Sequence, residues 1–257
     1  GEDEAMLVRD DHAGRARQLV PILARQPPQG ICSILASESP PMAKPIKHVD
    51  PREELASALT HGLGATAALA GGAILITLAA LHGDRWQLGA SIVFGIALLA
   101  LYVASTLYHA IQHPVAKGRL KVFDHCAIYV LIAGTYTPFT LIGLRGPVGW
   151  WMFGAIWTLA LAGVIFKLFY TGRFKLLSTG IYLVMGWLVM LAIKPMLAAL
   201  DAWTLGWLIA GGLSYTLGTF FYHRESIRYS HAIWHLFVLG GSTCHYIAVM
   251  AQVVPAR

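Results

Sequence analysis

Seven long apolar runs follow the first fifty residues and leave few folds open to this chain. Each run approaches the roughly 20 residues that an α-helix needs to cross the hydrocarbon core of a bilayer. No run alternates strictly between apolar and polar residues, so a membrane β-barrel is excluded. We therefore expect an all-α polytopic membrane protein, a bundle of seven transmembrane helices. The runs cover residues 55–81, 88–111, 123–143, 148–169, 176–193, 202–222 and 230–254.

Composition agrees with a membrane protein. Hydrophobic residues make up 56 % of the chain and charged residues 12 %, whereas soluble domains carry roughly 25 % charged residues. The net charge of +6 comes from basic residues at the ends of the apolar runs, so it does not indicate nucleic-acid binding. The three cysteines (Cys32, Cys126 and Cys244) are dispersed without a CxxC pair, so we expect no disulfide framework.

The first 41 residues differ from the rest of the chain. They begin with Gly, mix charge with Pro and Ser, and lack the apolar core of a signal peptide. The segment from Met42 to Lys47 is typical of a natural start that leads into a first span. We expect residues 1–41 to be a disordered or non-native extension and residues 42–257 to be the membrane domain.

Lysine and arginine are distributed unevenly between the two sides of the predicted bundle. Because short loops rich in these residues stay in the cytoplasm, the distribution predicts a cytoplasmic N-terminus and, with seven spans, an outside C-terminus. Eleven lie on the N-terminal side (Lys44, Lys47, Arg52, Lys117, Arg119, Lys121, Lys167, Arg173, Lys175, Arg224 and Arg228) and four on the other side (Arg85, Arg145, Lys194 and Arg257).

Two histidines open the last apolar run. His231 and His235 are four residues apart, so on a helix they share a face and lie about 6 Å apart along the axis. Polar rings inside a membrane are costly unless their nitrogens find partners. A metal ion would satisfy both, because His-x-x-x-His on a helix is a common way to hold zinc.

The predicted orientation brings further polar residues to the same depth. His109 ends the second run and Asp124 begins the third. Three imidazoles plus a water form the open coordination sphere of catalytic zinc, so we predict Zn²⁺ on His109, His231 and His235. Asp124 could complete the coordination, but we prefer it as the group that orients or deprotonates the water. Ser105, one turn before His109, is the candidate to hydrogen-bond a group beside the ligands or a developing oxyanion.

Simpler interpretations remain open for each of these residues. The paired histidines can be interfacial rings bonded to water or carbonyl groups, and Asp124 can be a helix N-cap. His61 is interpreted as structural. His245 lies about 21 Å from His231 along a helix and is interpreted as a packed residue. His125 is expected to point away from Asp124.

These motifs resemble a known family. Ser105-x-x-x-His109, Asp124 and His231-x-x-x-His235, in this order, are similar to the hemolysin III branch of the progestin and adipoQ receptor family. That family belongs to a wider group of seven-helix membrane proteins that includes alkaline ceramidases. The first run also resembles the family motif, with Glu54, Thr60 and His61 in place and Ser57 where eukaryotic receptors usually have Asn.

The resemblance extends from Met42 to the C-terminus and implies a function. It implies zinc on the three histidines beside Asp124 and Ser105, a lipid-derived amide as substrate, and the inner membrane of a bacterium as location. The leading hypothesis is a zinc-dependent hydrolase of a lipid-like amide or ester at the cytoplasmic leaflet, with the substrate arriving from the bilayer.

Other classes of function are weighed against this one. A receptor or membrane-homeostasis factor would use the same ligands as a structural zinc clamp. A pore-forming cytolysin ranks lower, because the runs show no amphipathic pore-lining stripe. A retinal protein is excluded because residues 230–254 contain no lysine. Oligomeric state remains open.

Overall fold

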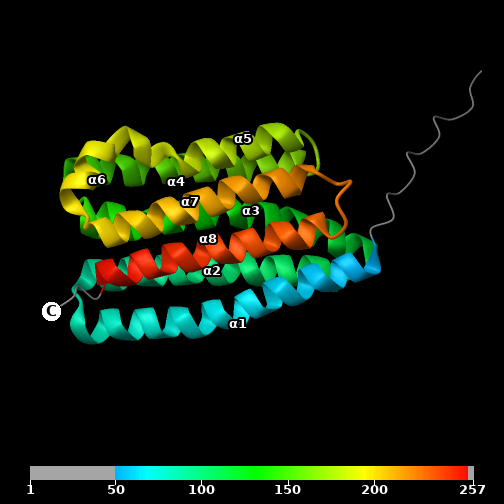
Figure 1. Cartoon of the computed structure of the whole chain (residues 1–257), viewed down its shortest axis with the longest axis horizontal. Coiled ribbons are helices and arrows are strands. Elements are labelled where there is room, and N and C mark those ends of the chain that lie inside the picture. Colours follow the sequence, from blue (N-terminus) through cyan, green and yellow to red (C-terminus); the bar gives the residue numbers. More distant parts are fainter. Residues whose placement is uncertain (1–49, 254–257) are drawn as a thin grey trace, which may run out of the picture. The chain divides into compact units, whose positions relative to one another are not determined.

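The computed structural model describes residues 50–253, and all regular elements within this range are helical (Figure 1). The expectation for residues 1–41 lies outside the described residues. The elements are α1 (Pro51–His82), α2 (Arg85–Ala110), α3 (Pro114–Pro138), a π-helical turn (Phe139–Gly143), α4 (Pro147–Tyr170), α5 (Lys175–Gly186), a 3₁₀ segment (Leu188–Ala192), α6 (Ile193–Ala199), α7 (Ala202–His223) and α8 (Ser230–Val253).

Within residues 50–253, six helical stretches are long and apolar enough to cross a membrane. The chain is thus a multi-pass membrane protein with six such stretches, against seven predicted. The 22-residue α7 is not among the six. Its Ser, Thr, Tyr and Gly residues lower its mean hydropathy, and some of them bond to α8: Ser214 donates to the Phe237 carbonyl and Tyr215 Oη lies 2.8 Å from Ser242 Oγ.

The fifth predicted span is longer and less regular than the run at 176–193. It continues to Ala199 and is interrupted by the 3₁₀ segment between α5 and α6. Pro195 has no backbone N–H, and it sits in the first turn of α6, where a helix has no intrahelical partner for that group. The hydroxyl of Tyr136 on α3 supports the interruption, because it approaches the Met185 carbonyl and accepts from the Val189 N–H, both at 2.9 Å.

α3 begins nine residues before the apolar run at 123–143, at Pro114. The basic residues Lys117, Arg119 and Lys121 therefore lie in its first turns. His113 is the N-cap residue, and Asp124 lies ten residues after Pro114. The alternative interpretation of Asp124 as a helix cap is thus wrong. Pro138 ends α3 and leads directly into the π-helical turn.

Helix neighbours determine where the polar residues meet. α2 packs against α1 and α3, and α8 packs against α7 and α1 (Figure 1). Gly72 and Gly95 face each other where α1 and α2 meet, and a Cβ at Gly72 would lie 3.7 Å from Cα of Gly95, an ordinary van der Waals contact. This packing sets the end of α2 beside the start of α8.

Candidate metal centre

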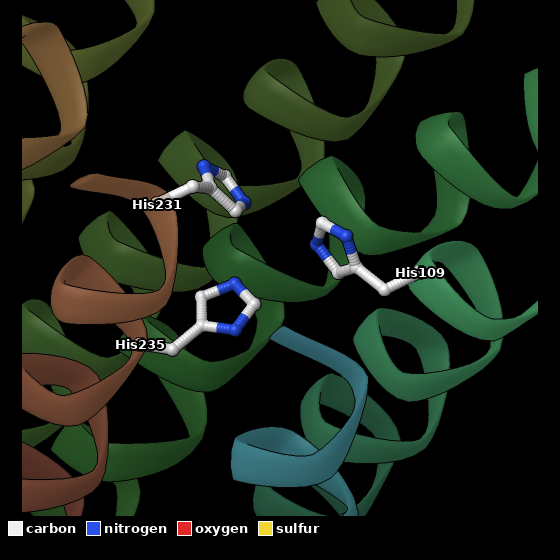
Figure 2. A group of neighbouring side chains, drawn as sticks. All are labelled: His109, His231 and His235. Atoms are coloured by element: carbon white, nitrogen blue, oxygen red, sulfur yellow. The ribbon is translucent and has the colours of Figure 1, made fainter. Parts of the chain in front are cut away.

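Three histidines from two helices point toward one another (Figure 2). His109 comes from the last turn of α2, and His231 and His235 from the first two turns of α8. Their ring centroids are 4.7–5.0 Å apart, and one nitrogen of each ring lies within 4.8 Å of the other two. The structure therefore brings together the three residues predicted as ligands, two of them fully buried and His231 partly so.

Hydrogen bonds orient two of these rings for metal binding. His109 Nδ1 lies 3.0 Å from Glu54 Oε2, and His235 Nδ1 lies 3.2 Å from the Ser57 carbonyl oxygen. Because an ionised carboxylate and a carbonyl only accept, each Nδ1 carries the hydrogen. Each Nε2 then keeps its lone pair, the tautomer that metal-binding histidines usually adopt.

The donor set fits a zinc ion. His109 Nε2 is buried and has no hydrogen-bond partner among residues 50–253, a costly state that a bound cation would relieve. Three neutral imidazole nitrogens suit zinc and leave a fourth tetrahedral position free.

Two acidic residues at the start of α1 support the histidines. Besides binding His109, Glu54 Oε2 accepts from Lys117 Nζ at 2.9 Å. Glu53 Oε1 accepts from the backbone N–H of His231 at 3.0 Å, which places a negative charge at the N-terminus of α8. Sequence reasoning noted Glu54 only as part of the family motif and did not assign it to the site.

His61 lies next to the histidine cluster. Its ring stacks on His235, with centroids 3.5 Å apart and planes at 11°, and it meets Tyr102 edge-on. Both of its ring nitrogens are buried without a hydrogen-bond partner in the described part of the chain. The structural interpretation of His61 did not anticipate this stacking, since nothing local in the sequence connects α1 to α8.

Ser105 and Asp124 are both buried and both line a cavity that His235 also lines. Ser105 Oγ has no partner among residues 50–253, so its hydroxyl is free to donate. Asp124 Oδ2 lies 3.3 Å from His125 Nδ1, too poorly aligned for a hydrogen bond. The expectation that His125 points away from Asp124 is therefore wrong.

The cavity has a volume of about 410 Å³ and a mostly apolar lining. Its polar end contains His61, Ser105, Asp124 and His235, and its other end reaches the apolar residues Leu144, Met152 and Met196. The lining runs along α3 from Asp124 to Tyr136 and on to Phe139 and Thr140 in the π-helical turn, which corresponds to more than about 20 Å of helix. Such a space suits an elongated apolar chain with a polar group at the histidine end.

Comparisons with known proteins identify the family of the chain. A family model described as "Haemolysin-III related" matches residues 49–246. "Hemolysin-3" of Bacillus cereus is 47 % identical over 204 residues, which cover 79 % of this chain and 93 % of that protein. The "Hemolysin-3 homolog" of Bacillus subtilis (strain 168) is 47 % identical over 199 residues, covering 77 % of this chain and 93 % of the homolog.

A human relative is more distant. The "Monocyte to macrophage differentiation factor" of Homo sapiens is 32 % identical over 205 residues, which cover 77 % of this chain and 83 % of that protein. These matches confirm the resemblance inferred from the serine, aspartate and histidine motifs. The chain belongs to the Haemolysin-III related family.

Proposed function

We propose that this protein is a zinc-dependent hydrolase that cleaves an amide or ester bond of a membrane lipid. One observation carries the proposal: His235 of the three-histidine cluster, together with Ser105 and Asp124, lines the polar end of a long apolar cavity. An acyl chain in the cavity would bring its carbonyl group to these side chains. The family match supports a membrane location and leaves the reaction open.

The side chains divide the chemistry among them. His109, His231 and His235 would hold the ion, which when bound supplies Lewis acidity toward a carbonyl oxygen and a water. Asp124 lines the cavity, and its carboxylate accepts the proton of the attacking water and passes it to the amine or alcohol that leaves when the C–N or C–O bond breaks. Ser105 uses its free hydroxyl to donate to the oxygen on which negative charge develops.

We further propose that α7 completes seven spans and that the N-terminus faces the cytoplasm. The uneven distribution of Lys and Arg supports this orientation, and the packing of α7 along α8 supports its place in the bilayer. The histidines would then act at the cytoplasmic leaflet of a bacterial inner membrane, where a lipid would reach the cavity from between the helices.

Metal content and lipid turnover test the proposal together. Elemental mass spectrometry of detergent-purified protein should find about one zinc per chain, lost in His109→Ala and His235→Ala. His82→Ala is the matched control, because His82 is exposed in the last turn of α1. Wild type that stays empty after zinc is added back would refute the metal site.

Turnover is then measured with a panel of N-acyl and O-acyl lipids. Zinc-loaded wild type should release fatty acid, and Asp124→Asn should keep its zinc and lose most turnover. Full turnover by zinc-loaded Asp124→Asn would refute the role of Asp124 as base.

A structural zinc clamp is the second candidate. It is favoured by the position of the three ligands, which would tie α2 to α8, with Glu54 adding α1 through His109. For a clamp, zinc removal by a chelator lowers the thermal unfolding midpoint while no lipid of the panel is hydrolysed. Fatty-acid release that depends on zinc would exclude a purely structural role.

A further inference from the structure

His245 is a further polar residue of the cavity, far from the cluster of His109, His231 and His235. It lies ten residues after His235 on α8 and also lines the cavity. At the rise of an α-helix the two residues are about 15 Å apart along the axis. His245 is therefore too distant to share an ion with the cluster.

One hydrogen bond determines which nitrogen of His245 remains available. Nε2 lies 3.2 Å from the carbonyl oxygen of Leu208 on α7. Because a carbonyl only accepts, Nε2 carries the hydrogen and Nδ1 presents a lone pair. Nδ1 has no hydrogen-bond partner among the described residues 50–253.

The surroundings hold this ring in place. A Cβ at position 211 would collide with Cδ2 and Nε2 of His245, so Gly211 leaves the space that the ring fills. The ring of Tyr215 lies 5.4 Å away, and its hydroxyl is paired with Ser242. The ring of His245 thus has a defined position in the wall of the cavity.

Other polar groups in this part of the cavity already have partners. Their hydroxyls bond to backbone carbonyl groups, so an apolar chain can pass them without leaving a donor unpaired. These bonds are Thr135 to Leu131, Thr140 to Tyr136, Thr216 to Gly212, and Tyr136 to Met185. His245 differs from them in presenting an imidazole nitrogen, which is a stronger hydrogen-bond acceptor than a hydroxyl oxygen.

We propose that His245 Nδ1 accepts a hydrogen bond from a hydroxyl group within the lipid chain, so that the cavity selects a mid-chain hydroxylated acyl group. The roughly 15 Å between His235 and His245 corresponds to about a dozen carbon–carbon bonds from the carbonyl carbon. This inference rests on the proposed lipid hydrolase and names its substrate class more closely. A hydroxyl near that position would pair with Nδ1, whereas a hydroxyl next to the carbonyl would not reach it.

The test measures binding, which does not depend on turnover. Stearic, 2-hydroxystearic and 12-hydroxystearic acids compete with a fluorescent fatty acid bound to the full chain in nanodiscs. Wild type should bind the 12-hydroxy acid about three- to tenfold more tightly than stearic acid, as one net hydrogen bond implies. Wild type should bind the 2-hydroxy acid about as tightly as stearic acid, because its hydroxyl would not reach His245.

Three variants locate the effect. His245→Phe should lose the preference for the 12-hydroxy acid and still bind stearic acid, whereas His245→Gln should keep it because its amide supplies both a donor and an acceptor. Thr243→Val is the matched control, since Thr243 is exposed nearby on α8. If His245→Phe does not fold, the affinities of wild type and His245→Gln for the three acids provide the test.

The outcomes separate this inference from the proposed function. Equal binding of the three acids by wild type, or an unchanged preference in His245→Phe, overturns the role of His245. A 12-hydroxy preference without hydrolysis of any lipid overturns the hydrolase and leaves the selective cavity standing. Absence of binding by every acid overturns the cavity as a lipid site and the inference with it.

Discussion

Glu54→Gln is the variant that most directly tests how the histidine cluster is oriented. In the wild type, Glu54 Oε2 accepts two hydrogen bonds, from His109 Nδ1 at an N···O distance of 3.0 Å and from Lys117 Nζ at 2.9 Å. The substitution keeps the size of the side chain and removes its charge. It also introduces an NH₂ group that, when turned toward His109, donates to Nδ1 and forces the hydrogen onto Nε2.

The expected magnitude follows from these contacts. A hydrogen bond to a charged group is roughly twice as strong as a neutral one, so the loss is about 1–1.5 kcal/mol. Zinc binding makes the ring N–H a stronger donor, so most of this loss should appear in metal affinity. We expect zinc to bind about tenfold more weakly. Folding should suffer less, because Lys117 keeps its bond to the Tyr108 carbonyl at 3.1 Å.

The assay is a competition between the protein and a chromophoric zinc chelator in detergent. Glu53→Gln is the matched control, because Glu53 binds the backbone N–H of His231 and no imidazole ring. It should keep zinc affinity within about threefold, a loss limited by the modest interaction of an acid with a helix N-terminus. If Glu54→Gln bound zinc as tightly as wild type while His109→Ala lost it, Glu54 would not orient the ligand.

Three further predictions concern packing, capping and pore formation. Gly163→Ala should lower stability by about 1–3 kcal/mol, measured as a reduced thermal midpoint in detergent, because the new Cβ would collide with the fully buried ring of Tyr129; an unchanged midpoint would contradict this α3–α4 packing. Asp84→Ala should cost about 1 kcal/mol through loss of the N-cap of α2. The backbone N–H groups of Gln87 and Trp86 hold the pKa of Asp84 below its usual value, so its contribution is present near neutral pH and fades as the pH falls through that lowered pKa. Wild type and Asp84→Ala should therefore converge in acid, and a difference that grows in acid would argue against the cap. Liposomes with the protein at low density should retain an encapsulated dye, since the leading hypothesis needs no pore, and leakage that scales with protein would revive the cytolysin alternative.

Much of the candidate site follows from local sequence rules. The 3.6-residue period of a helix puts His231 and His235 on one face without any knowledge of the fold. The distribution of Lys and Arg predicts a side for each apolar run, and with it a common depth for His109, Asp124 and that pair. These rules act within one helix or across one membrane, so a single sequence is sufficient to apply them.

Sequence reasoning was less accurate where a helix is irregular. The run at 176–193 predicts one span, but the chain continues through a 3₁₀ segment to Ala199, with Tyr136 of another helix supporting the interruption. Likewise, α3 starts at Pro114 among basic residues that looked like a loop. Hydropathy marks the part of a helix that meets lipid, and it does not report how far the helix extends beyond the lipid or which partner sustains a break.

By itself, then, the sequence determined the helical membrane fold, the family motifs and the common depth of the polar residues, because each depends on local periodicity, composition or order along the chain. Only the tertiary structure decided that Glu54 orients His109 across 55 positions of sequence, that His61 stacks on His235, and that His245 faces the cavity with a free acceptor. Those relations depend on which helices become neighbours and on how each is rotated about its axis. Both are set by side-chain packing between segments far apart in the chain, which no local pattern encodes.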